Sequence, residues 1–260
     1  MDIIGVIPAR FGSTRFPGKP LKLVAGKPLL QWVVEAAKTS KKLTQVWVAT
    51  DDDRIAQLAK TLDVKVAMTE SELPTGSDRV WQAVKNTSAE IIVNIQGDEP
   101  LLQGELLDSL VQPLIDDRQL EMATLGRPLD EEALLSQNTA KIVLNARHEA
   151  IYFSRFPIPF SRQKWSAKPT DAGLQGVNDF SGTVLKHVGL YAYRKSFLEK
   201  FCAQKPVGVE ILESLEQLRA LYLGARIKVV RTEHESWGVD TPEDVAKIEA
   251  MIASRKRTSS

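Results

Sequence analysis

The segment IIGVIPARFGSTRFPGKP, residues 3–20, joins a short apolar run to a loop that is rich in glycine, proline and cations. The run itself, residues 3–8, is apolar at nearly every position, as is typical of a strand buried on both faces of a parallel sheet. Three further β-rich runs of strand length follow, at residues 45–50, 65–69 and 90–97. We therefore expect the loop to follow the carboxyl end of a strand inside a parallel sheet.

Helix-like segments alternate with these runs. Apolar residues recur at helical spacing in residues 28–39, 52–62 and 77–86, and Asp51 or Asp52 is a suitable N-cap for the second segment. Repeated alternation of strand and helix predicts right-handed βαβ units. The sequence thus predicts an α/β fold, with a mostly parallel sheet that helices cover on both faces.

Beyond residue 97 the alternation is looser, and one stretch is neither helix-like nor strand-like. Residues 161–183 are polar and aperiodic, which predicts a long loop. The strands expected in this half are residues 122–125, 141–144, 184–193 and 226–231, and the expected helices are residues 105–115, 209–223 and 241–253. We see no linker composition, and expect one domain with an inserted or appended segment.

Composition limits the class of protein. The 260 residues include 34 Lys and Arg against 33 Asp and Glu, so the net charge of +1 provides no field for nucleic acid or a membrane surface. The single cysteine, Cys202, excludes an intramolecular disulfide and a cysteine-based zinc site. Asp2 stands where a signal peptide carries bases, and no window reaches the ~18 apolar residues of a membrane span. We expect a soluble, cytoplasmic protein.

Three cations, Arg10, Arg15 and Lys19, lie in the loop after the first predicted strand. Ligands of open α/β sheets bind outside the carboxyl ends of the strands, and glycines let backbone N–H groups approach phosphate oxygens. The spacing matches neither a Walker loop nor a Gly-x-Gly-x-x-Gly turn. A solvated basic turn is the alternative, but three cations in one such loop favour a polyphosphate site.

Two acidic residues are candidate metal ligands. Asp98 ends the apolar strand in VNIQGDEP, residues 93–100, and Asp240 lies in GVDTPED, residues 238–244. Mg²⁺ takes one or two carboxylates together with substrate phosphates. Turn chemistry explains Asp98 equally well in isolation, and helix capping explains Asp240. Together with the basic loop, however, the two acids form the constellation expected for nucleotidyl transfer.

Other candidates carry weaker signals. The sequence TGSDR, residues 75–79, enters a helix and is either an anion site or an N-cap with a local Asp–Arg pair. His187 is either a packed strand histidine or a polar anchor for a substrate, and Glu216 with Gln217 is either a solvated helix face or part of a site. His148 and His234 show no ligand spacing with each other or with His187, which argues against a zinc site.

The basic loop, residues 8–20, closely resembles the signature of the CMP-sugar synthetase family. Five further motifs make the chain similar to the 3-deoxy-manno-octulosonate (Kdo) cytidylyltransferase branch: QGDEP at 96–100, YFSR at 152–155, KHVGLY at 186–191, LEQLR at 215–219 and VDTPED at 239–244. The motifs occur in order between about residue 3 and residue 253. Their number makes the resemblance far more specific than any single motif.

The resemblance implies a reaction and an architecture. The family transfers CMP from CTP to the anomeric hydroxyl of Kdo and releases pyrophosphate, which supplies lipopolysaccharide synthesis with an activated sugar. It implies a nucleotide-diphospho-sugar-transferase-like fold, Mg²⁺ as cofactor, a homodimer, and no nucleic acid or membrane partner. The implied single domain, residues 1–260, has its nucleotide-binding core at about 1–125 and 206–253, and a sugar-binding and dimerisation segment at about 126–205.

The resemblance also implies roles for individual residues. The implied catalytic set is Lys19, Asp98, Arg10 and Asp240, with Asp98 and Asp240 as the Mg²⁺ ligands. Arg10 and Lys19 would hold the CTP phosphates, and Arg15 would lie at the junction of phosphate and sugar. The remaining implied substrate contacts are Ala9, Gly76, Ser77 and Arg79 for base and ribose, His187, Tyr191, Glu216 and Gln217 for Kdo, Arg155 for the sugar carboxylate or the dimer contact, and Gln96.

Several alternatives stay open. The family usually has Ser-Gly-Thr-Glu-Arg where this chain has TGSDR at 75–79, and the shorter acid is similar to a sub-branch acting on 8-amino-8-deoxy-Kdo. Sialic acid is the nearest rival sugar. A GT-A glycosyltransferase would use an Asp-x-Asp motif, but the acids at 51–53 are better explained as a helix cap. A non-catalytic nucleotide-binding module is the third alternative; release of pyrophosphate from CTP and Kdo distinguishes all of them.

Overall fold

The computed structural model describes residues 1–12, 16–160 and 182–258. The strands are β1 (Ile3–Ala9), β2 (Leu23–Val24), β3 (Lys27–Pro28), β4 (Gln45–Thr50), β5 (Lys65–Met68), β6 (Ile91–Asn94), β7 (Met122–Arg127), β8 (Lys141–Leu144), β9 (Ala150–Ser154), β10 (Val184–Arg194) and β11 (Ile227–Arg231). The helices are η1 (Lys19–Leu21, a 3₁₀ turn), α1 (Leu29–Lys38), α2 (Asp53–Thr61), α3 (Gly76–Val84), α4 (Gly104–Asp116), α5 (Glu131–Leu135), α6 (Lys195–Ala203), α7 (Gly208–Glu213), α8 (Gln217–Tyr222) and α9 (Pro242–Thr258).

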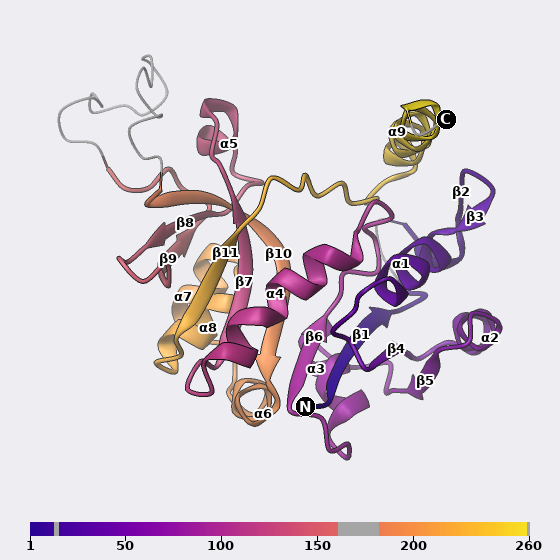
Figure 1. Ribbon diagram of the computed structural model, residues 1–260, viewed down its shortest axis with the longest axis horizontal. Coiled ribbons are helices and arrows are strands. Elements are labelled where there is room, and N and C mark those ends of the chain that lie inside the picture. The colour runs from indigo at the N-terminus through magenta and orange to yellow at the C-terminus, as the bar shows by residue number, and fades with distance from the viewer. Residues whose placement is uncertain (13–15, 161–181, 259–260) are drawn as a thin grey trace.

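Nine of the described strands form one sheet in the order β11-β7-β10-β6-β1-β4-β5, with β8 paired to β10 and β9 to β8 (Figure 1). β1 runs parallel to both β4 and β6, and β10 is antiparallel to β6, β7 and β8. The predicted mostly parallel sheet is therefore confirmed. Because β1, β4 and β6 run in one direction, the loops after them meet at one rim.

Helices cover both faces of the sheet, as predicted. Apolar residues of α1, α2 and α4 pack on one face, and those of α3, α6 and α8 pack on the other. The strand β1 supplies both layers, with Ile3 and Ile7 on the first face and Ile4 and Val6 on the second. This two-sided burial is the reason that the run reads as continuously apolar in the sequence.

Two helices begin at caps that lie beside the rim. The carboxylate of Asp52 accepts hydrogen bonds from the backbone N–H groups of Arg54 and Ile55, so the capping interpretation of residues 51–53 is confirmed. The hydroxyl of Thr75 accepts a hydrogen bond from the Asp78 N–H at 3.2 Å and starts α3. Both caps hold a loop that follows a parallel strand.

The predicted single helix at 209–223 is wrong, because Ser214 has a left-handed backbone with φ of 52°. The chain forms α7 and α8 instead, and the break places Gln217 as the first residue of α8. The strand β9 and the helices α5 and α6 were not predicted. The predicted loop at 161–183 lies, apart from its last two residues, outside the described residues.

The segment from residue 126 to residue 205 does not form a separate layer in its described part. It adds β8 and β9 to the sheet and inserts β10 between β6 and β7. Its assignment to sugar binding and dimerisation stays a prediction. Among the described residues, no helix combines the length and the apolar character that crossing a membrane requires.

Candidate active site

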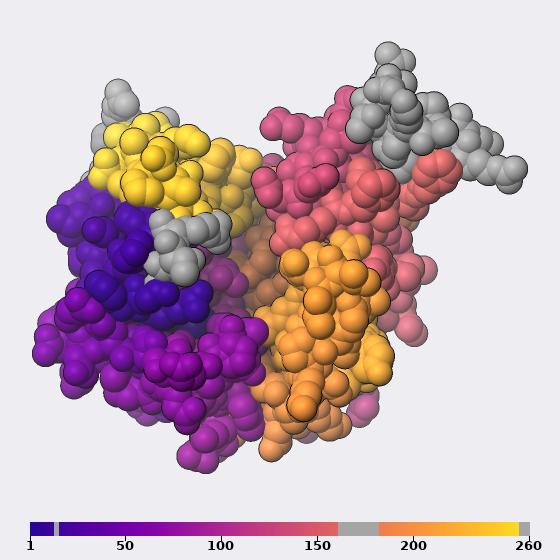
Figure 2. All heavy atoms as spheres, turned by 180° about the vertical axis from the view of Figure 1, so that it is seen from behind, coloured from indigo at the N-terminus to yellow at the C-terminus, as the bar shows by residue number. Residues whose placement is uncertain are grey.

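A cavity of about 280 Å³ lies at the rim where β1 and β6 end. Its walls are residues 8–10, 19–20, 73–76 and 96–98, together with Arg79 and Asp240. Figure 2 shows the molecular surface hollowed between the N-terminal half, in indigo and purple, and the orange and pink segments. The cavity therefore lies where the sequence predicts a ligand site.

The basic loop enters this cavity through a tight turn. Gly18 has a φ of 67°, a left-handed conformation that favours glycine, and its N–H donates to the Phe11 carbonyl at 2.9 Å. The turn starts the 3₁₀ segment with Lys19, while Arg10 lines the cavity with an exposed side chain. Arg15, the third predicted cation, lies outside the described residues.

Lys19 brings the two predicted metal ligands together. Its ammonium lies 2.7 Å from Asp98 Oδ2 and 3.2 Å from Asp240 Oδ1. These acids are 28% and 49% exposed, so both remain accessible from the cavity. Asp98 and Asp240 therefore both contact Lys19 of the basic loop at one rim, and their role as metal ligands stays a prediction.

Backbone contacts hold the two acids in this arrangement. The Val239 N–H donates to the Asp98 carbonyl at 2.9 Å, which ties the turn after β6 to the segment before α9. Asp244 Oδ2 accepts from the backbone N–H groups of Asp240 and Thr241, at 3.0 and 2.9 Å. Gly97 lies against β1, where a Cβ would come within 3.1 Å of the Pro8 carbonyl oxygen. Hydrogen bonds and close packing thus fix the relation between the two turns.

A polar cluster adjoins the cavity around Glu216. One Glu216 oxygen lies 2.9 Å from the Thr75 hydroxyl, and the other accepts from the Ser77 hydroxyl at 3.0 Å. Burial raises the pKa of Glu216, and the two hydroxyls oppose that rise. Thr75 belongs both to the cavity wall and to this cluster, so the two form one continuous polar surface.

The predicted sugar contacts on β10 extend the same cluster. The Tyr191 hydroxyl donates to Gln217 Oε1 at 3.0 Å, and the Tyr191 and His187 rings are 5.4 Å apart between centroids. His187 Nε2 lies 3.0 Å from the Thr124 hydroxyl. Gln96 joins this group to the cavity, because its Nε2 donates to the Gly189 carbonyl at 3.0 Å.

His187 is neutral in this setting. Burial lowers its pKa to about 3 from an ordinary value of 6.5, and the nearby Arg155 guanidinium contributes to the decrease. A neutral ring beside the Thr124 hydroxyl acts as a hydrogen-bonding group, not as a cation. Burial also raises the pKa of Tyr191, which keeps its hydroxyl protonated.

The His187→Gln variant tests this protonation state. Between pH 6.5 and pH 3 the unfolded chain binds a proton that the folded chain does not, so stability falls as the pH decreases through this window. We expect the loss of unfolding free energy from pH 7 to pH 5 to be smaller in the variant, by about 1–2 kcal/mol. Urea unfolding at both pH values measures it, and equal losses in the two proteins would contradict the assignment.

Two predicted arginines contact protein groups in this structure. Arg79 is buried and contacts Asp51 at 3.2 Å and the Thr69 hydroxyl, so the local Asp–Arg pair involves Asp51 and not Asp78. The Arg155 guanidinium donates to four backbone carbonyls, those of Gln137, Asn138, Glu213 and Ser214. Their contacts with a substrate stay predictions.

Some residues of the site were not singled out in the sequence. Asn94 Nδ2 lies 3.4 Å from the Ser77 hydroxyl beneath the cluster. Glu99 is 2% exposed directly after Asp98. The position of Asn94, on an otherwise apolar strand and next to a predicted site, was the signal available in the sequence.

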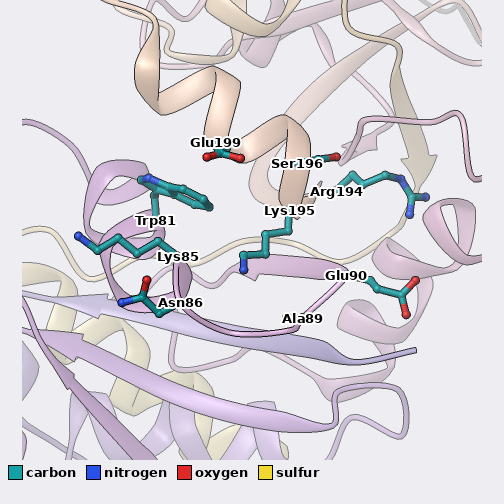
Figure 3. Close-up of a pocket in the computed structure, with 9 residues that line it drawn as sticks. All are labelled: Trp81, Lys85, Asn86, Ala89, Glu90, Arg194, Lys195, Ser196 and Glu199. Carbon is teal, nitrogen blue, oxygen red and sulfur yellow. The ribbon is translucent and has the colours of Figure 1, made fainter.

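A larger hollow of about 640 Å³ lies at the opposite end of the sheet (Figure 3). Two of the cations that line it have partners in the protein: Lys195 donates to the Thr87 carbonyl, and Arg194 donates to the Leu114 and Asp117 carbonyls. The carboxylates of Glu90 and Glu199 line it as well. We therefore do not assign the phosphate site to this hollow, whatever its size.

Comparisons with known proteins identify the family. A family model described as cytidylyltransferase matches residues 4–227. A 3-deoxy-manno-octulosonate cytidylyltransferase from Bdellovibrio bacteriovorus is 53% identical over 98% of this chain and 99% of its own length. The chain belongs to the family of 3-deoxy-manno-octulosonate cytidylyltransferases.

Two further members of this cytidylyltransferase family agree with the assignment. The protein of the same name from Geobacter sulfurreducens is 46% identical over 95% of this chain and 98% of its own length. A solved structure of CMP:2-keto-3-deoxy-manno-octonic acid synthetase complexed with CTP is 37% identical, with a TM-score of 0.87, and covers 98% of this chain and 100% of that chain. The chain is thus a cytidylyltransferase enzyme, which excludes a glycosyltransferase and a non-catalytic module.

Proposed function

We propose that this cytidylyltransferase transfers CMP from CTP to the anomeric hydroxyl of Kdo, giving CMP-Kdo and pyrophosphate for lipopolysaccharide synthesis. The observation that carries the proposal is the contact of Lys19 with both Asp98 and Asp240, in a cavity bordered by the Glu216 cluster. One side of this surface has cations for a triphosphate, and the other has hydroxyl, amide and carboxyl groups for a polyol. The names of the relatives support the choice of substrates.

Mg²⁺ fits the two acids. No group of three or more His, Cys, Asp and Glu side chains gathers at ion-binding distance within the described ranges, whereas Asp98 and Asp240 converge on one ammonium. One or two carboxylates completed by substrate phosphates is the ligand set that Mg²⁺ prefers. We propose that Asp98 and Asp240 hold Mg²⁺, which when bound lowers the pKa of the sugar hydroxyl and neutralises phosphate charge.

The side chains of the chain itself supply the rest of the mechanism. Attack on the α-phosphate increases negative charge on its oxygens and on the departing pyrophosphate, so Lys19 and Arg10 stabilise the transition state more than the ground state. Ala9 and the loop 75–79 contact base and ribose. His187, Tyr191, Glu216 and Gln217 orient the sugar, which places its hydroxyl for in-line attack.

An 8-amino-8-deoxy-Kdo is the second candidate acceptor. The Thr75 hydroxyl lies 2.9 Å from an Asp78 oxygen as well as from a Glu216 oxygen, so two carboxylates border this part of the surface. Paired carboxylates favour an ammonium group over a neutral hydroxyl. This observation concerns only the acceptor, and the reaction is the same for both sugars.

One experiment tests these proposals together. The purified enzyme is incubated with CTP, Mg²⁺ and one acceptor, and pyrophosphate release is measured with Kdo, 8-amino-8-deoxy-Kdo and sialic acid in parallel. We expect release with Kdo, and a higher kcat/KM for the amino sugar if the second candidate is correct. Release with sialic acid alone would contradict both assignments.

We further propose that the enzyme is cytoplasmic, since CTP is a cytoplasmic nucleotide. We also propose that it is a homodimer. Around β9 and α7 several large apolar side chains are solvent-exposed, with Phe156 at 58%, Ile211 at 64% and Leu212 at 87%. The two elements are in contact, because Ser154 on β9 donates to Glu213 on α7 at 2.7 Å. Exposed apolar side chains on two elements that are in contact favour association with a second copy.

The Leu212→Asp variant tests the dimer. An aspartate buried in an apolar dimer interface is unfavourable, so we expect the dissociation constant of the dimer to rise about a hundredfold or more. Sedimentation equilibrium measures it, with Leu23→Asp as the matched control, because Leu23 is also exposed, at 62%, but lies on the small β2–β3 hairpin. A monomeric wild type, or a variant that dimerises as well as wild type, would contradict the proposed interface.

A further inference from the structure

The turn between α7 and α8, residues 214–216, determines where two groups of the Glu216 cluster lie. Glu216 is the last residue of this turn and contacts two hydroxyls beside the cavity. Gln217 follows it as the first residue of α8 and accepts a hydrogen bond from the Tyr191 hydroxyl at 3.0 Å. Because hydrogen bonds weaken steeply with distance, a shift of the turn by about 1 Å would break these contacts. The position of the turn therefore matters for the cluster.

The helices α7 and α8 are joined to each other by a buried ion pair. Arg219 of α8 donates from Nε to Glu210 Oε2 of α7 at 2.9 Å, and both side chains are buried. The Glu210 carbonyl also accepts from the Leu215 N–H at 3.1 Å, which closes the turn. These contacts fix the shape of the helix pair. They do not involve β9, the strand beside which the pair lies (Figure 1), so a separate interaction fixes the pair to that strand.

The carboxylate of Glu213, the last residue of α7, provides this interaction. Its Oε1 accepts from the Ser154 hydroxyl at 2.7 Å, and its Oε2 accepts from the Arg155 backbone N–H at 2.9 Å. Ser154 is 2% exposed, so its bond to the carboxylate is shielded from water. Two charge-assisted hydrogen bonds to adjacent residues define both the distance and the orientation of α7 relative to the end of β9.

The Arg155 guanidinium strengthens the same junction from the opposite direction. It donates from Nε to the Glu213 carbonyl at 3.0 Å and from Nη2 to the Ser214 carbonyl at 3.4 Å. The left-handed backbone of Ser214 ends α7, and carbonyls at a helix end need donors from outside the helix. Residues on β9 and on the turn thus donate and accept across one junction.

The end of β9 is itself held firmly by Lys141. This side chain is fully buried, and its ammonium donates to the Arg155 carbonyl as well as to the Ser136 and Thr139 carbonyls, the latter two at 2.8 Å. A buried ammonium with three backbone acceptors is well satisfied and resists displacement. The strand end to which Glu213 binds is therefore a fixed support.

We propose that Glu213 is a positioning residue that fastens the α7–α8 turn to the end of β9 and so holds Glu216 and Gln217 in the cluster. The catalytic part of this inference rests on the proposed function, in which these two residues orient Kdo. The fastening part does not, because it concerns only the enzyme without substrates. One measurement is therefore made without substrates and one with them.

The first measurement is hydrogen exchange of backbone amides in the free enzyme. The Leu215 N–H, bonded to the Glu210 carbonyl, reports on the turn directly. We expect Ser154→Ala and Glu213→Ala to speed exchange of the peptide spanning residues 214–219 about tenfold, because each removes a hydrogen bond to a charged group. Ser154→Ala alters a buried side chain and leaves the carboxylate in place, so it carries the test alone if Glu213→Ala does not fold.

Two control variants match these changes elsewhere in the chain. Ser109→Ala removes a hydroxyl that donates to the Leu106 carbonyl of its own helix at 2.8 Å. Glu199→Ala removes an exposed carboxylate on α6. Neither side chain contacts the α7–α8 turn, so exchange of the same peptide should stay within about twofold of the wild type, as for ordinary surface changes.

The second measurement is steady-state pyrophosphate release with Kdo and CTP varied in turn. We expect Ser154→Ala and Glu213→Ala to raise the KM for Kdo about tenfold and to leave the KM for CTP within about twofold. A general loss of folded enzyme would instead lower kcat and leave both KM values unchanged. Glu213→Gln keeps an acceptor for the Arg155 N–H and a donor for Ser154 Oγ, so its KM for Kdo should lie within about threefold of the wild type.

Each outcome decides one part of the proposal. Unchanged exchange in both alanine variants overturns the fastening role of Glu213, and faster exchange with an unchanged KM for Kdo overturns the positioning of Glu216 and Gln217. If the wild-type enzyme releases no pyrophosphate from CTP and Kdo, the proposed function fails, while the exchange experiment still decides whether Glu213 fastens the turn.

Discussion

Replacing Asp98 with asparagine should reduce CMP transfer by roughly a thousandfold while leaving CTP binding measurable. Asp98 lies at the end of β6 and contacts Lys19 at 2.7 Å, so it faces the point where the α-phosphate of CTP is proposed to lie. The amide keeps the shape of the side chain but removes the charge that we propose holds Mg²⁺. The proposed base and ribose contacts are made by other residues, which is why CTP should still bind.

The measurement combines pyrophosphate release with calorimetric titration of CTP. Asp240→Asn should give the same pattern, because Asp240 meets the same ammonium at 3.2 Å. Asp53→Asn is the matched control, since Asp53 is exposed in the first turn of α2. Near-normal turnover in both active-site variants would refute the metal assignment, and loss of CTP binding together with turnover would indicate a structural role instead.

The sheet was predictable because its strands are buried on both faces. In β1 the residues Ile3 and Ile4 pack into opposite layers, so the run is apolar without interruption and its strand length is evident. The N-caps of α2 and α3 were also predictable from the sequence, because an Asp or Thr side chain accepts hydrogen bonds from backbone N–H groups only a few residues away. Local signals of this kind need no knowledge of distant partners.

The meeting of the two acids was predictable only as a consequence of topology. Lys19 is 79 residues from Asp98 and 221 residues from Asp240, and no local pattern pairs them. Parallel strands and a rim of loops were sufficient to predict the approach of Asp98 to Lys19. Asp240 was a second candidate metal ligand in the sequence, but the segment between β11 and α9 that carries it has no periodic pattern that would indicate how it reaches Lys19.

Other features depend on tertiary contacts that a sequence pattern does not contain. Ser214 adopts a left-handed backbone that glycine would have signalled, so the break between α7 and α8 was not visible. Arg79 contacts Asp51, 28 residues earlier, instead of the adjacent Asp78. Glu99 resembled an ordinary turn residue in the sequence, but its side chain is 2% exposed and lies beside His234 of the segment after β11.

Replacing Lys19 with alanine should raise the KM for CTP about a hundredfold and reduce kcat by a smaller factor. The ammonium is only 16% exposed, and it lies between two carboxylates at the entrance to the phosphate side of the cavity. Without it the negative charges of Asp98 and Asp240 are balanced only by the proposed Mg²⁺, and an incoming triphosphate loses one of its two proposed protein cations. The KM for CTP should therefore change more than kcat.

A control variant distinguishes loss of the Lys19 contact with phosphate from a general change in surface charge. Lys22→Ala removes an exposed cation three residues away and should leave the KM for CTP within about twofold, because surface charges are screened by salt. The KM for Kdo should change little in Lys19→Ala, since the proposed sugar contacts lie on β10 and at the start of α8. A KM for CTP equal to that of the wild type would remove Lys19 from the phosphate site. Equal increases in the KM values of both substrates would show that Lys19 supports the folded rim and does not bind phosphate.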